Sequence, residues 1–307
     1  LILSNNARPI PALTFDRLSS RPFESRWLGW IGPWDLSVMF GQLEKERAIP
    51  NAQFFGLRFN FRPAPSLEIG FSRSAQWCGD GRPCDLGTFG DLLLGKDNRG
   101  DEGVDFENEP GNQLAGFDLR WSPAFLGHSV AVYGQFIGED EAGGFPSKWL
   151  GQVGAEWTSY WFDRWSARIY AEFADTTCQF YDSPANFNCA YNHGNYRTGY
   201  RFRSRSIGYA ADNDARLASL GFIIVDADNV QWRASLRLGE LNRGGAVDSA
   251  NTLTATSKDL LSLDLAHSRT FYFGVIDVGA GYEMLDDIAI GESDNEAHFY
   301  VQWRSSF

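Results

Sequence analysis

Apolar and polar side chains alternate along most of this chain, and this periodicity constrains its fold more than any other feature. In the final segment, every second residue from Phe299 to Trp303 is apolar, whereas the register from His298 to Arg304 is polar or amphipathic. Such a pattern indicates a β-strand with one apolar face and one polar face. About a dozen segments repeat it, so the chain is predicted to be all-β.

The predicted strands are 33–42, 55–62, 67–77, 115–121, 127–137, 149–158, 165–174, 215–225, 230–241, 259–266, 271–285 and 298–307, with a less regular start between 10 and 30. One short helix is expected at Leu86–Leu94. Alternation alone does not decide which face is outside. The apolar face points to the core of a soluble sandwich but to lipid in a membrane barrel.

The connections between the predicted strands fall into two alternating kinds. Short turns occur at 63–66, 122–127, 159–164, 226–229 and 267–270, and longer polar loops at 43–51, 78–111, 138–148, 175–214, 242–258 and 286–296. Greek-key sandwiches mix loop lengths at both ends, whereas outer-membrane barrels place short turns in the periplasm and long loops outside. The predicted fold class is therefore a transmembrane antiparallel up-and-down β-barrel of the bacterial outer membrane, with membrane lipid as a partner.

Aromatic side chains gather where the predicted strands end. Trp121, Trp157 and Phe271 fall at the short-turn side and Trp149 at the other, as in the aromatic girdles of such barrels. The C-terminal Phe307 should anchor the last strand at the periplasmic rim. A terminal aromatic residue also resembles the recognition signal of outer-membrane barrels, so the barrel-assembly machinery is an expected partner.

Composition excludes several other classes of protein. No run of about 18 apolar residues exists, so no transmembrane helix is predicted. The formal net charge of -12 argues against a nucleic-acid partner. The opening segment 1–9 has neither the basic stretch nor the cleavage site of a secretory signal. We expect residues 1–307 to be one barrel domain from which N-terminal parts are missing.

The register assigned to the lumen carries charges of both signs, including Arg58, Asp118, Glu156, Arg168 and Asp277. Unpaired charges are costly in a narrow interior. Ion pairs that fill and stiffen the barrel are the simpler reading, and a selective conduit is the alternative.

Four cysteines fall in the long loops on one side of the predicted barrel. Local pairing of Cys78 with Cys84 and of Cys178 with Cys189 is the simplest connectivity in the oxidising periplasm. A tetrathiolate zinc site is less consistent with these spacings. Neither a metal site nor a cofactor is predicted. Only His193 and His298 of the four histidines can reach the outer mouth. Because no catalytic constellation stands out around them, we expect a protein without enzymatic activity.

One long loop interleaves aromatic and basic residues within an otherwise acidic chain. The residues of interest are Tyr191, Tyr196, Arg197, Tyr200, Arg201, Arg203 and Arg205. Rings stack on sugar faces, and guanidinium groups bind carboxylates in a fork geometry, so this loop is predicted to bind an acidic polysaccharide. The alternative is a hairpin that folds into the mouth and pairs with acidic neighbours.

Several stretches carry a resemblance to a known family, namely 7–15 (ARPIPALTF), 41–52 (GQLEKERAIPNA), 56–61 (GLRFNF), 67–77 (LEIGFSRSAQW) and above all 92–101 (LLLGKDNRGD). They resemble the Wzi family of capsule-assembly outer-membrane proteins. The resemblance runs along the whole chain and covers the C-terminal two-thirds of a family member. It implies an 18-stranded barrel with a periplasmic helical bundle. The bundle and the first strands have no counterpart in this chain.

The resemblance also implies a function. A family member is a surface lectin that helps attach capsular polysaccharide to the cell, and a porin or polysaccharide-export conduit is the alternative. The most specific string suggests a second binding region at Lys96, Asp97, Asn98 and Arg99. The other reading of that string is a loop packed into the barrel mouth.

Overall fold

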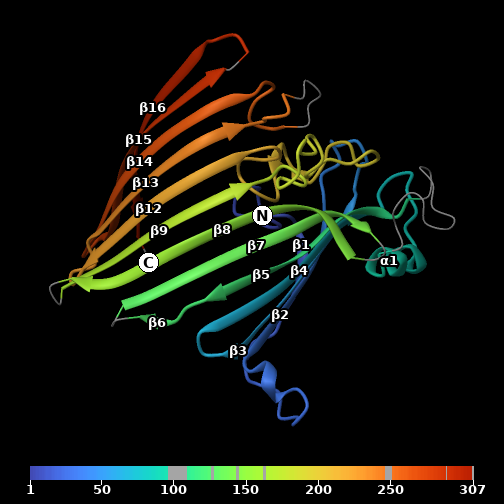
Figure 1. Cartoon of the computed structure of the whole chain (residues 1–307), viewed down its shortest axis with the longest axis horizontal. Helices are drawn as coiled ribbons and strands as arrows, with labels where there is room; N and C mark the ends of the chain where they lie inside the picture. The colour runs from blue at the N-terminus through green and yellow to red at the C-terminus, as the bar shows by residue number, and fades with distance from the viewer. Residues whose placement is uncertain are drawn as a thin grey trace.

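One large antiparallel sheet dominates the computed structural model, which describes residues 1–95, 109–125, 128–142, 145–161, 164–245, 251–287 and 289–305 (Figure 1). The strands are β1 (Ala12–Asp16), β2 (Trp34–Gln42), β3 (Gln53–Ala64), β4 (Leu67–Trp77), β5 (Gly111–Trp121), β6 (Ala124–Phe125), β7 (His128–Ala142), β8 (Phe145–Trp161), β9 (Trp165–Asp175), β10 (Arg201–Phe202), β11 (Arg205–Ser206), β12 (Arg216–Asp226), β13 (Gln231–Leu241), β14 (Lys258–Phe271), β15 (Gly274–Asp287) and β16 (Ser293–Arg304). The helices are η1 (Gly29–Ile31) and α1 (Leu86–Leu93).

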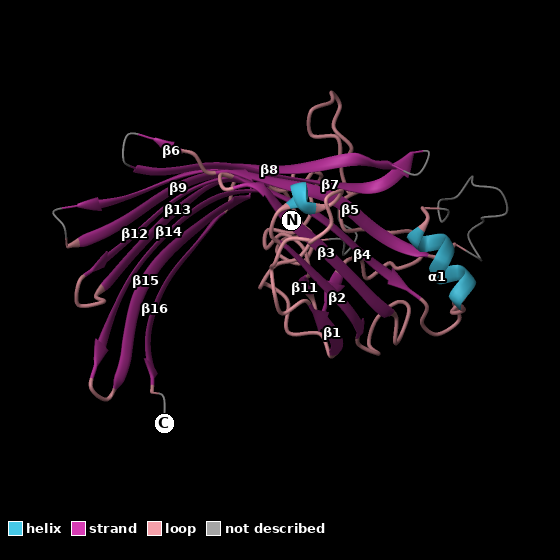
Figure 2. Ribbon diagram, turned by 90° about the horizontal axis from the view of Figure 1, so that it is seen from below, coloured by secondary structure: helices cyan, strands magenta, loops and turns pink. Residues whose placement is uncertain are grey.

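Strand order in the sheet follows chain order from β1 to β16, with β6 beside β7 and with β10 and β11 forming a separate hairpin. Every pairing in the sheet is antiparallel, as an up-and-down barrel requires. Figure 2 shows the sheet curved into a trough, with long loops gathered inside the curve beside β2, β3 and β4. No helix in the described residues has the length and apolarity needed to cross a membrane.

The convex face of the sheet is apolar. Phe71 lies opposite Phe117, which lies opposite Phe136, so cross-strand registers keep apolar residues on one face. Exposed members of this face are Leu13, Phe15, Phe71, Phe117, Leu119, Val132, Val153, Phe173, Leu220, Phe222, Leu263, Leu265, Phe299 and Val301. Exposure of so many large apolar side chains is expected where lipid replaces water.

The concave face carries the charged register, and the predicted pairing of opposite charges is confirmed there. Arg58 holds Asp118 with two hydrogen bonds of 2.7 and 2.9 Å. Glu156 accepts from Arg168 at 2.6 Å and from Arg120. Further pairs are Arg233–Asp277, Arg237–Asp264 and Arg62–Glu68. These bridges link neighbouring or next-neighbouring strands.

Glycines on the concave face leave room for aromatic rings of the adjacent strand. A Cβ at Gly221 would lie 2.1 Å from the ring of Tyr170, and a Cβ at Gly279 would lie 2.3 Å from the ring of Tyr300. The rings therefore lie flat over the neighbouring backbone. This arrangement, in which an aromatic residue covers a cross-strand glycine, favours one register of pairing.

The structure corrects the predicted connections in three places. The predicted loop 286–296 is shorter than expected, because β15 extends to Asp287 and β16 begins at Ser293. The predicted loop 138–148 is mostly strand, because β7 and β8 continue pairing to Ala142 and Phe145. The predicted turn 267–270 lies inside β14, and the chain turns after Phe271 instead. The predicted short helix is confirmed as α1, with Asp85 as its N-cap. Phe307 lies outside the described residues, so its anchoring role stays a prediction.

Replacing Gly239 by Ala should destabilise the barrel by about 2 kcal/mol or more. This glycine has a φ of +151°, and a Cβ there would lie 1.9 Å from the carbonyl oxygen of Arg216. The measurement is the urea concentration at which half of the protein has lost the gel mobility of the folded barrel. That mobility is read in detergent as the difference between unboiled and boiled samples. Gly90→Ala is the matched control, because nothing lies within 4 Å of its added Cβ. Equal midpoints for the two variants would contradict the expected strain.

Candidate functional site

The connection between β9 and β12, residues 176–215, forms a folded unit that we call the cap. Its neck is closed by backbone hydrogen bonds from Thr176 to Ala215 at 2.8 Å and from Asp214 to Thr176 at 3.4 Å. The cap contributes seven of the fifteen buried residues in the largest apolar cluster of the described chain, and the others come from the strands, the connection between β2 and β3 and the N-terminal segment. It is therefore a packed structure within the curve of the sheet.

The three tyrosines of the predicted binding loop are buried rather than exposed. Tyr191 and Tyr200 have no exposed surface, and Tyr196 is 1% exposed. The Tyr191 and Tyr200 rings stack on each other with centroids 5.9 Å apart. The prediction that Tyr196 and Tyr200 are stacking platforms for sugars is wrong for this conformation, because other side chains already cover their faces.

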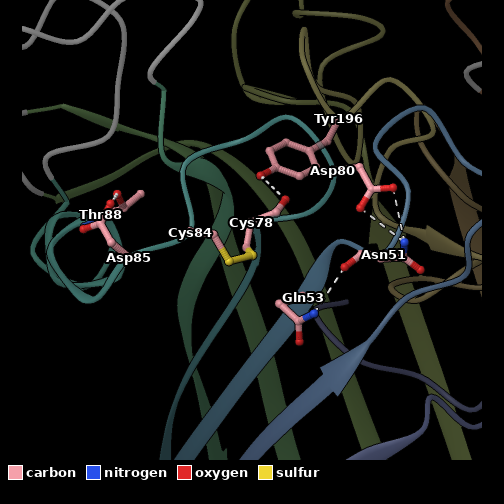
Figure 3. Close-up of a disulfide and its surroundings, with 8 residues drawn as sticks. All are labelled: Asn51, Gln53, Cys78, Asp80, Cys84, Asp85, Thr88 and Tyr196. Atoms are coloured by element: carbon pink, nitrogen blue, oxygen red, sulfur yellow. Dashed lines mark hydrogen bonds between the residues drawn. A yellow bond between two sulfur atoms is a disulfide. The ribbon is translucent and has the colours of Figure 1, made fainter.

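Each tyrosine hydroxyl has a partner far away in sequence. The Tyr200 hydroxyl lies 2.7 Å from Ser74 Oγ on β4, and the Tyr196 hydroxyl donates to the Cys78 carbonyl at 3.1 Å (Figure 3). Burial raises the pKa of Tyr196 to about 12 and raises the pKa of Tyr200 further. The hydroxyls therefore stay protonated and donate hydrogen bonds that fix the cap to the barrel wall.

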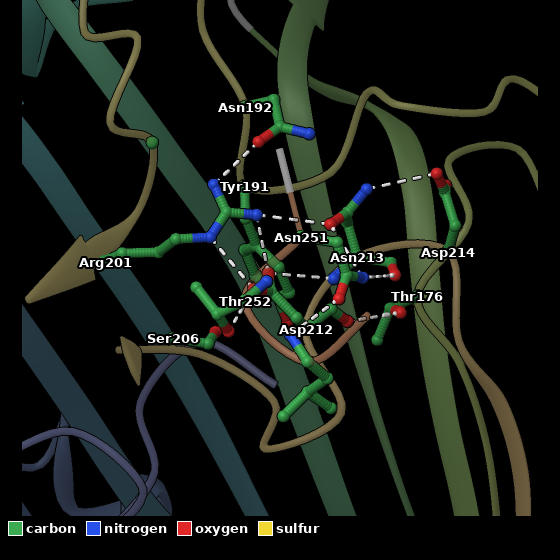
Figure 4. Close-up of polar contacts among 12 residues, drawn as sticks. Thr176, Tyr191, Asn192, Arg201, Ser206, Asp212, Asn213, Asp214, Asn251 and Thr252 are labelled. Carbon is green, nitrogen blue, oxygen red and sulfur yellow. Dashed lines mark hydrogen bonds and ion pairs between the residues drawn. The ribbon is translucent and has the colours of Figure 1, made fainter. Parts of the chain in front are cut away.

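Arg201 is also a structural residue. Its guanidinium binds both oxygens of Asp212, with Nη2–Oδ1 at 2.7 Å and Nε–Oδ2 at 2.9 Å (Figure 4). Both side chains are almost completely buried. Thr252 donates to the same carboxylate from its backbone nitrogen at 2.9 Å and its hydroxyl at 2.7 Å. Arg201 is therefore unavailable to a ligand, because its guanidinium is held inside the cap by Asp212. The same Asp212 carboxylate joins the cap to the loop that precedes β14.

The other three arginines of the predicted site are exposed. Arg203 occupies the tip of the β10–β11 hairpin, where it and Ser204 have φ values of 48° and 61°. Arg205 follows on β11, and its Nη1 lies 3.5 Å from the carbonyl oxygen of Asn6. Arg197 lies in the turn that precedes the hairpin, where its Nε donates to Gly194 at 3.4 Å. The structure thus brings Arg203 and Arg205 together at one exposed tip.

Two disulfides restrain the cap and the connection between β4 and α1. The structure joins Cys78 to Cys84, with Cα atoms 4.5 Å apart, and Cys178 to Cys189, with Cα atoms 5.9 Å apart. This is the local connectivity that the spacing predicts. Figure 3 shows the first disulfide between the end of β4 and the start of α1, beside Tyr196. Lys96, Asp97, Asn98 and Arg99 lie outside the described residues, so the structure does not test them.

Arg47 supports the hairpin and was not predicted from the sequence. This buried residue donates from Nη1 to the Arg201 carbonyl and from Nη2 to the Gly199 carbonyl, both at 3.1 Å. Burial lowers its pKa, and Glu44 opposes that effect. No local pattern indicates this role, because the partners lie more than 150 residues along the chain.

The fold and the cap define a class of protein. An up-and-down antiparallel sheet with an apolar exterior, a charge-paired interior, mostly short turns at one end and the longest folded loops at the other is a membrane-spanning β-barrel. Within the described residues, no cluster of histidine, cysteine and acidic side chains could hold a metal ion.

The chain belongs to the Wzi capsule assembly family, because the family described as "Capsule assembly protein Wzi" matches residues 1–297. A Klebsiella pneumoniae protein named "Uncharacterized 55.8 kDa protein in cps region" is 40% identical over 177 residues, which are 57% of this chain and 34% of that protein. A solved structure, described as an Escherichia coli outer membrane protein, Wzi, that is involved in group 1 capsule assembly and is a carbohydrate-binding β-barrel, is 29% identical with a TM-score of 0.79. That match covers 96% of this chain and 61% of the solved chain. The chain therefore spans less than two-thirds of the length of either relative.

Removing one partner of the buried pair should loosen the cap. Arg201→Met leaves the Asp212 carboxylate buried without its charge partner, which should cost about 3–5 kcal/mol. Limited proteolysis of the folded protein should then cut within residues 176–215, while heat-modifiable barrel mobility is retained. Arg197→Met is the matched control at an exposed position. Equal protease resistance of the two variants would contradict the structural role of Arg201.

The cap should be more stable at pH 4 than at pH 7 through Asp214. Burial raises the pKa of this carboxyl from 3.8 to about 6, although hydrogen bonds from Asn188 and Asn213 favour its charged form. The folded state therefore binds a proton more tightly than the unfolded state. Its stabilising contribution is complete below pH 3.8 and is lost as the pH rises to about 6, with a total near 3 kcal/mol.

Hydrogen exchange of cap amides at several pH values, corrected for intrinsic rates, measures this dependence. Asp214→Asn should abolish the decrease in cap stability that this carboxyl causes between pH 4 and pH 6. A cap that becomes more protected as pH rises through this window would show the opposite sign and contradict the assignment.

Proposed function

We propose that this chain is the barrel of a bacterial outer-membrane protein that binds acidic capsular polysaccharide at its outer face and helps to assemble or anchor the capsule, without catalysis. The observation that carries the proposal is the cap, a buried and cross-linked loop that presents the basic hairpin tip at Arg203 and Arg205. Membrane lipid and, through the last strand, the barrel-assembly machinery are the further partners in this proposal.

The relatives support the same role. The family is named for capsule assembly, and the solved structure is described as a carbohydrate-binding β-barrel involved in group 1 capsule assembly. The similar Klebsiella pneumoniae protein is described by its place in a cps region. A binding role that accompanies capsule formation is the simplest function common to these descriptions.

The geometry revises which residues would contact the polymer. Arg197, Arg203 and Arg205 are the exposed cations of the cap, and their guanidinium groups can bind sugar carboxylates in bidentate fashion. The net charge of -12 would repel an acidic polymer at long range, so contact must be made within a Debye length of about 8 Å. Lys96, Asp97, Asn98 and Arg99 remain proposed as a second contact region.

The framework beneath the hairpin favours binding in a second way. Arg201 and Phe202, which precede the tip, are 2% exposed, and Arg47 holds the Arg201 carbonyl. The tip is thus positioned before a ligand arrives. Less conformational entropy is then lost on binding than with a flexible loop.

A polysaccharide or solute conduit is the second candidate, favoured by the polar concave face. The cap opposes it, because its buried residues lie inside the curve of the sheet at the long-loop end (Figure 2). Single-channel recording of the full-length protein in planar bilayers distinguishes the two functions. Nearly silent membranes support the binding role, whereas stable ohmic conductance supports the conduit.

The variant carrying Arg197→Gln, Arg203→Gln and Arg205→Gln should bind acidic polysaccharide on the order of 100-fold more weakly, because each exposed contact contributes about 1 kcal/mol. Binding of the parent protein should also weaken with added salt. The measurements are retention of purified capsular polymer by the detergent-solubilised protein and release of capsule from cells. Barrel folding is checked by heat-modifiable mobility.

The matched control carries Arg62→Gln, Arg164→Gln and Arg269→Gln, which remove three exposed charges near the short turns. This control should bind polymer like the parent protein. If both triple variants bind equally well, or if the cap variant fails only because it does not fold, the cap arginines are not the binding residues.

A further inference from the structure

The connection between β1 and β2, residues 17–33, is the longest one described at the short-turn end of the barrel, and we call it the rim segment. Every other turn described at this end joins its strands within a few residues. A connection of this length needs a reason beyond reversing the chain direction. Figure 1 shows it extending past the end of the sheet.

The rim segment is folded against the barrel. Arg17 donates to the carbonyl of Arg21 at 2.9 Å and to that of Trp34, and the 3-10 helix η1 (Gly29–Ile31) follows. Gly32 has a φ of +72°, and a Cβ there would lie 2.1 Å from the Arg62 carbonyl oxygen. The backbone of the segment therefore approaches β3 as closely as only glycine permits.

Large apolar side chains of the rim segment point away from these contacts. Leu18 is 99% exposed, Trp27 is 76% exposed and Trp30 is 66% exposed. Burying side chains of this size is favourable, and exposure to water forgoes that stabilisation. An apolar medium at this rim would recover it.

The segment continues the apolar outer surface of the barrel. The Trp30 ring contacts the Phe61 ring edge-on at 6.2 Å, and Phe23 stacks on Trp34 at 4.5 Å. Phe61 and Trp34 lie opposite each other in the outward register of β3 and β2. Trp30 therefore extends the lipid-facing surface of the strands beyond their ends.

The charge of the rim segment is opposite to that of the whole chain. It contains three arginines, Arg17, Arg21 and Arg26, against one acidic residue, Glu24. Arg26 lies over the ring of Trp27 at 5.1 Å, and both Arg21 and Arg26 are exposed. Exposed arginines beside exposed tryptophans form the pattern of a segment lying at a membrane surface, with rings at headgroup depth and cations among phosphates.

We propose that the rim segment is an interfacial anchor that binds anionic phospholipid headgroups of the periplasmic leaflet. Arg21 and Arg26 bind the headgroup phosphates, and Leu18, Trp27 and Trp30 enter the adjoining acyl region. The inference rests on the membrane location of the barrel and is independent of polysaccharide binding at the other end.

Native mass spectrometry tests the headgroup contacts on the full-length protein, released from nanodiscs of phosphatidylglycerol and phosphatidylcholine. Arg21→Gln with Arg26→Gln should reduce retained phosphatidylglycerol on the order of tenfold and leave retained phosphatidylcholine unchanged. The control, Arg203→Gln with Arg205→Gln, removes the same charge at the opposite end and should retain lipid like the parent protein. Equal phosphatidylglycerol retention by both double variants would overturn the proposal.

Depth is measured by quenching of tryptophan fluorescence in vesicles that contain phosphatidylcholine brominated near the headgroup. The difference between the parent protein and Trp27→Phe with Trp30→Phe isolates the two rim tryptophans. Their emission should be quenched by the brominated lipid and protected from aqueous iodide. Emission quenched by iodide alone would place the segment in water, free for a periplasmic protein partner, and would overturn the proposal. Polysaccharide binding by both pairs of rim variants should equal that of the parent protein, so failure here is distinguishable from failure of the proposed function.

Discussion

The structure depends first on the rule that a backbone crossing hydrocarbon must satisfy every polar group internally. Strands can do so only by pairing edge to edge, and in the unbroken order from β1 to β16, each strand between the two ends pairs with a neighbour on both sides. The same rule fixes the two faces, since a register slip of one residue would turn apolar side chains inward and charges toward lipid. Charges that face the confined interior must then find partners, as Arg58 and Asp118 do. Alternation, topology and the charge-paired lumen are thus consequences of one constraint.

That constraint explains how much of the fold could be predicted from the sequence. Alternation is local, so most strands and their two faces could be predicted, and the longest loops were assigned to the correct end. The predicted strand ends were wrong where the requirement for internal backbone hydrogen bonding does not apply. The loop predicted at 138–148 is strand because β7 and β8 pair on beyond the expected membrane-spanning length. The turn after Phe271 comes late because Gly274, with a φ of +132°, lies beyond the expected turn.

Only the types of residue in the candidate site could be predicted from the sequence. The basic and aromatic loop could be identified from the sequence. Which of its side chains are buried and which are exposed depends on contacts with residues distant in the chain. Tyr200 is paired to Ser74 across 126 residues, and Arg47 reaches the Arg201 carbonyl across 154. One local signal was available. Asp212 lies eleven residues after Arg201, and a buried guanidinium requires a carboxylate within reach. Such partners separate structural arginines from those left exposed.

The two exposed basic regions lie at opposite ends of the barrel, and each places local positive charge on an acidic protein. A chain with net charge -12 repels polyanions and anionic lipid at a distance. At physiological salt, this repulsion is screened beyond about 8 Å, so a few local cations decide what binds at close range. The hairpin tip at Arg203 and Arg205 and the rim segment at Arg21 and Arg26 each rest on a folded support, the cap and the outer wall of β3. Under both proposals, acidic character elsewhere would add selectivity, because an anion would bind only where a preorganised arginine group meets it.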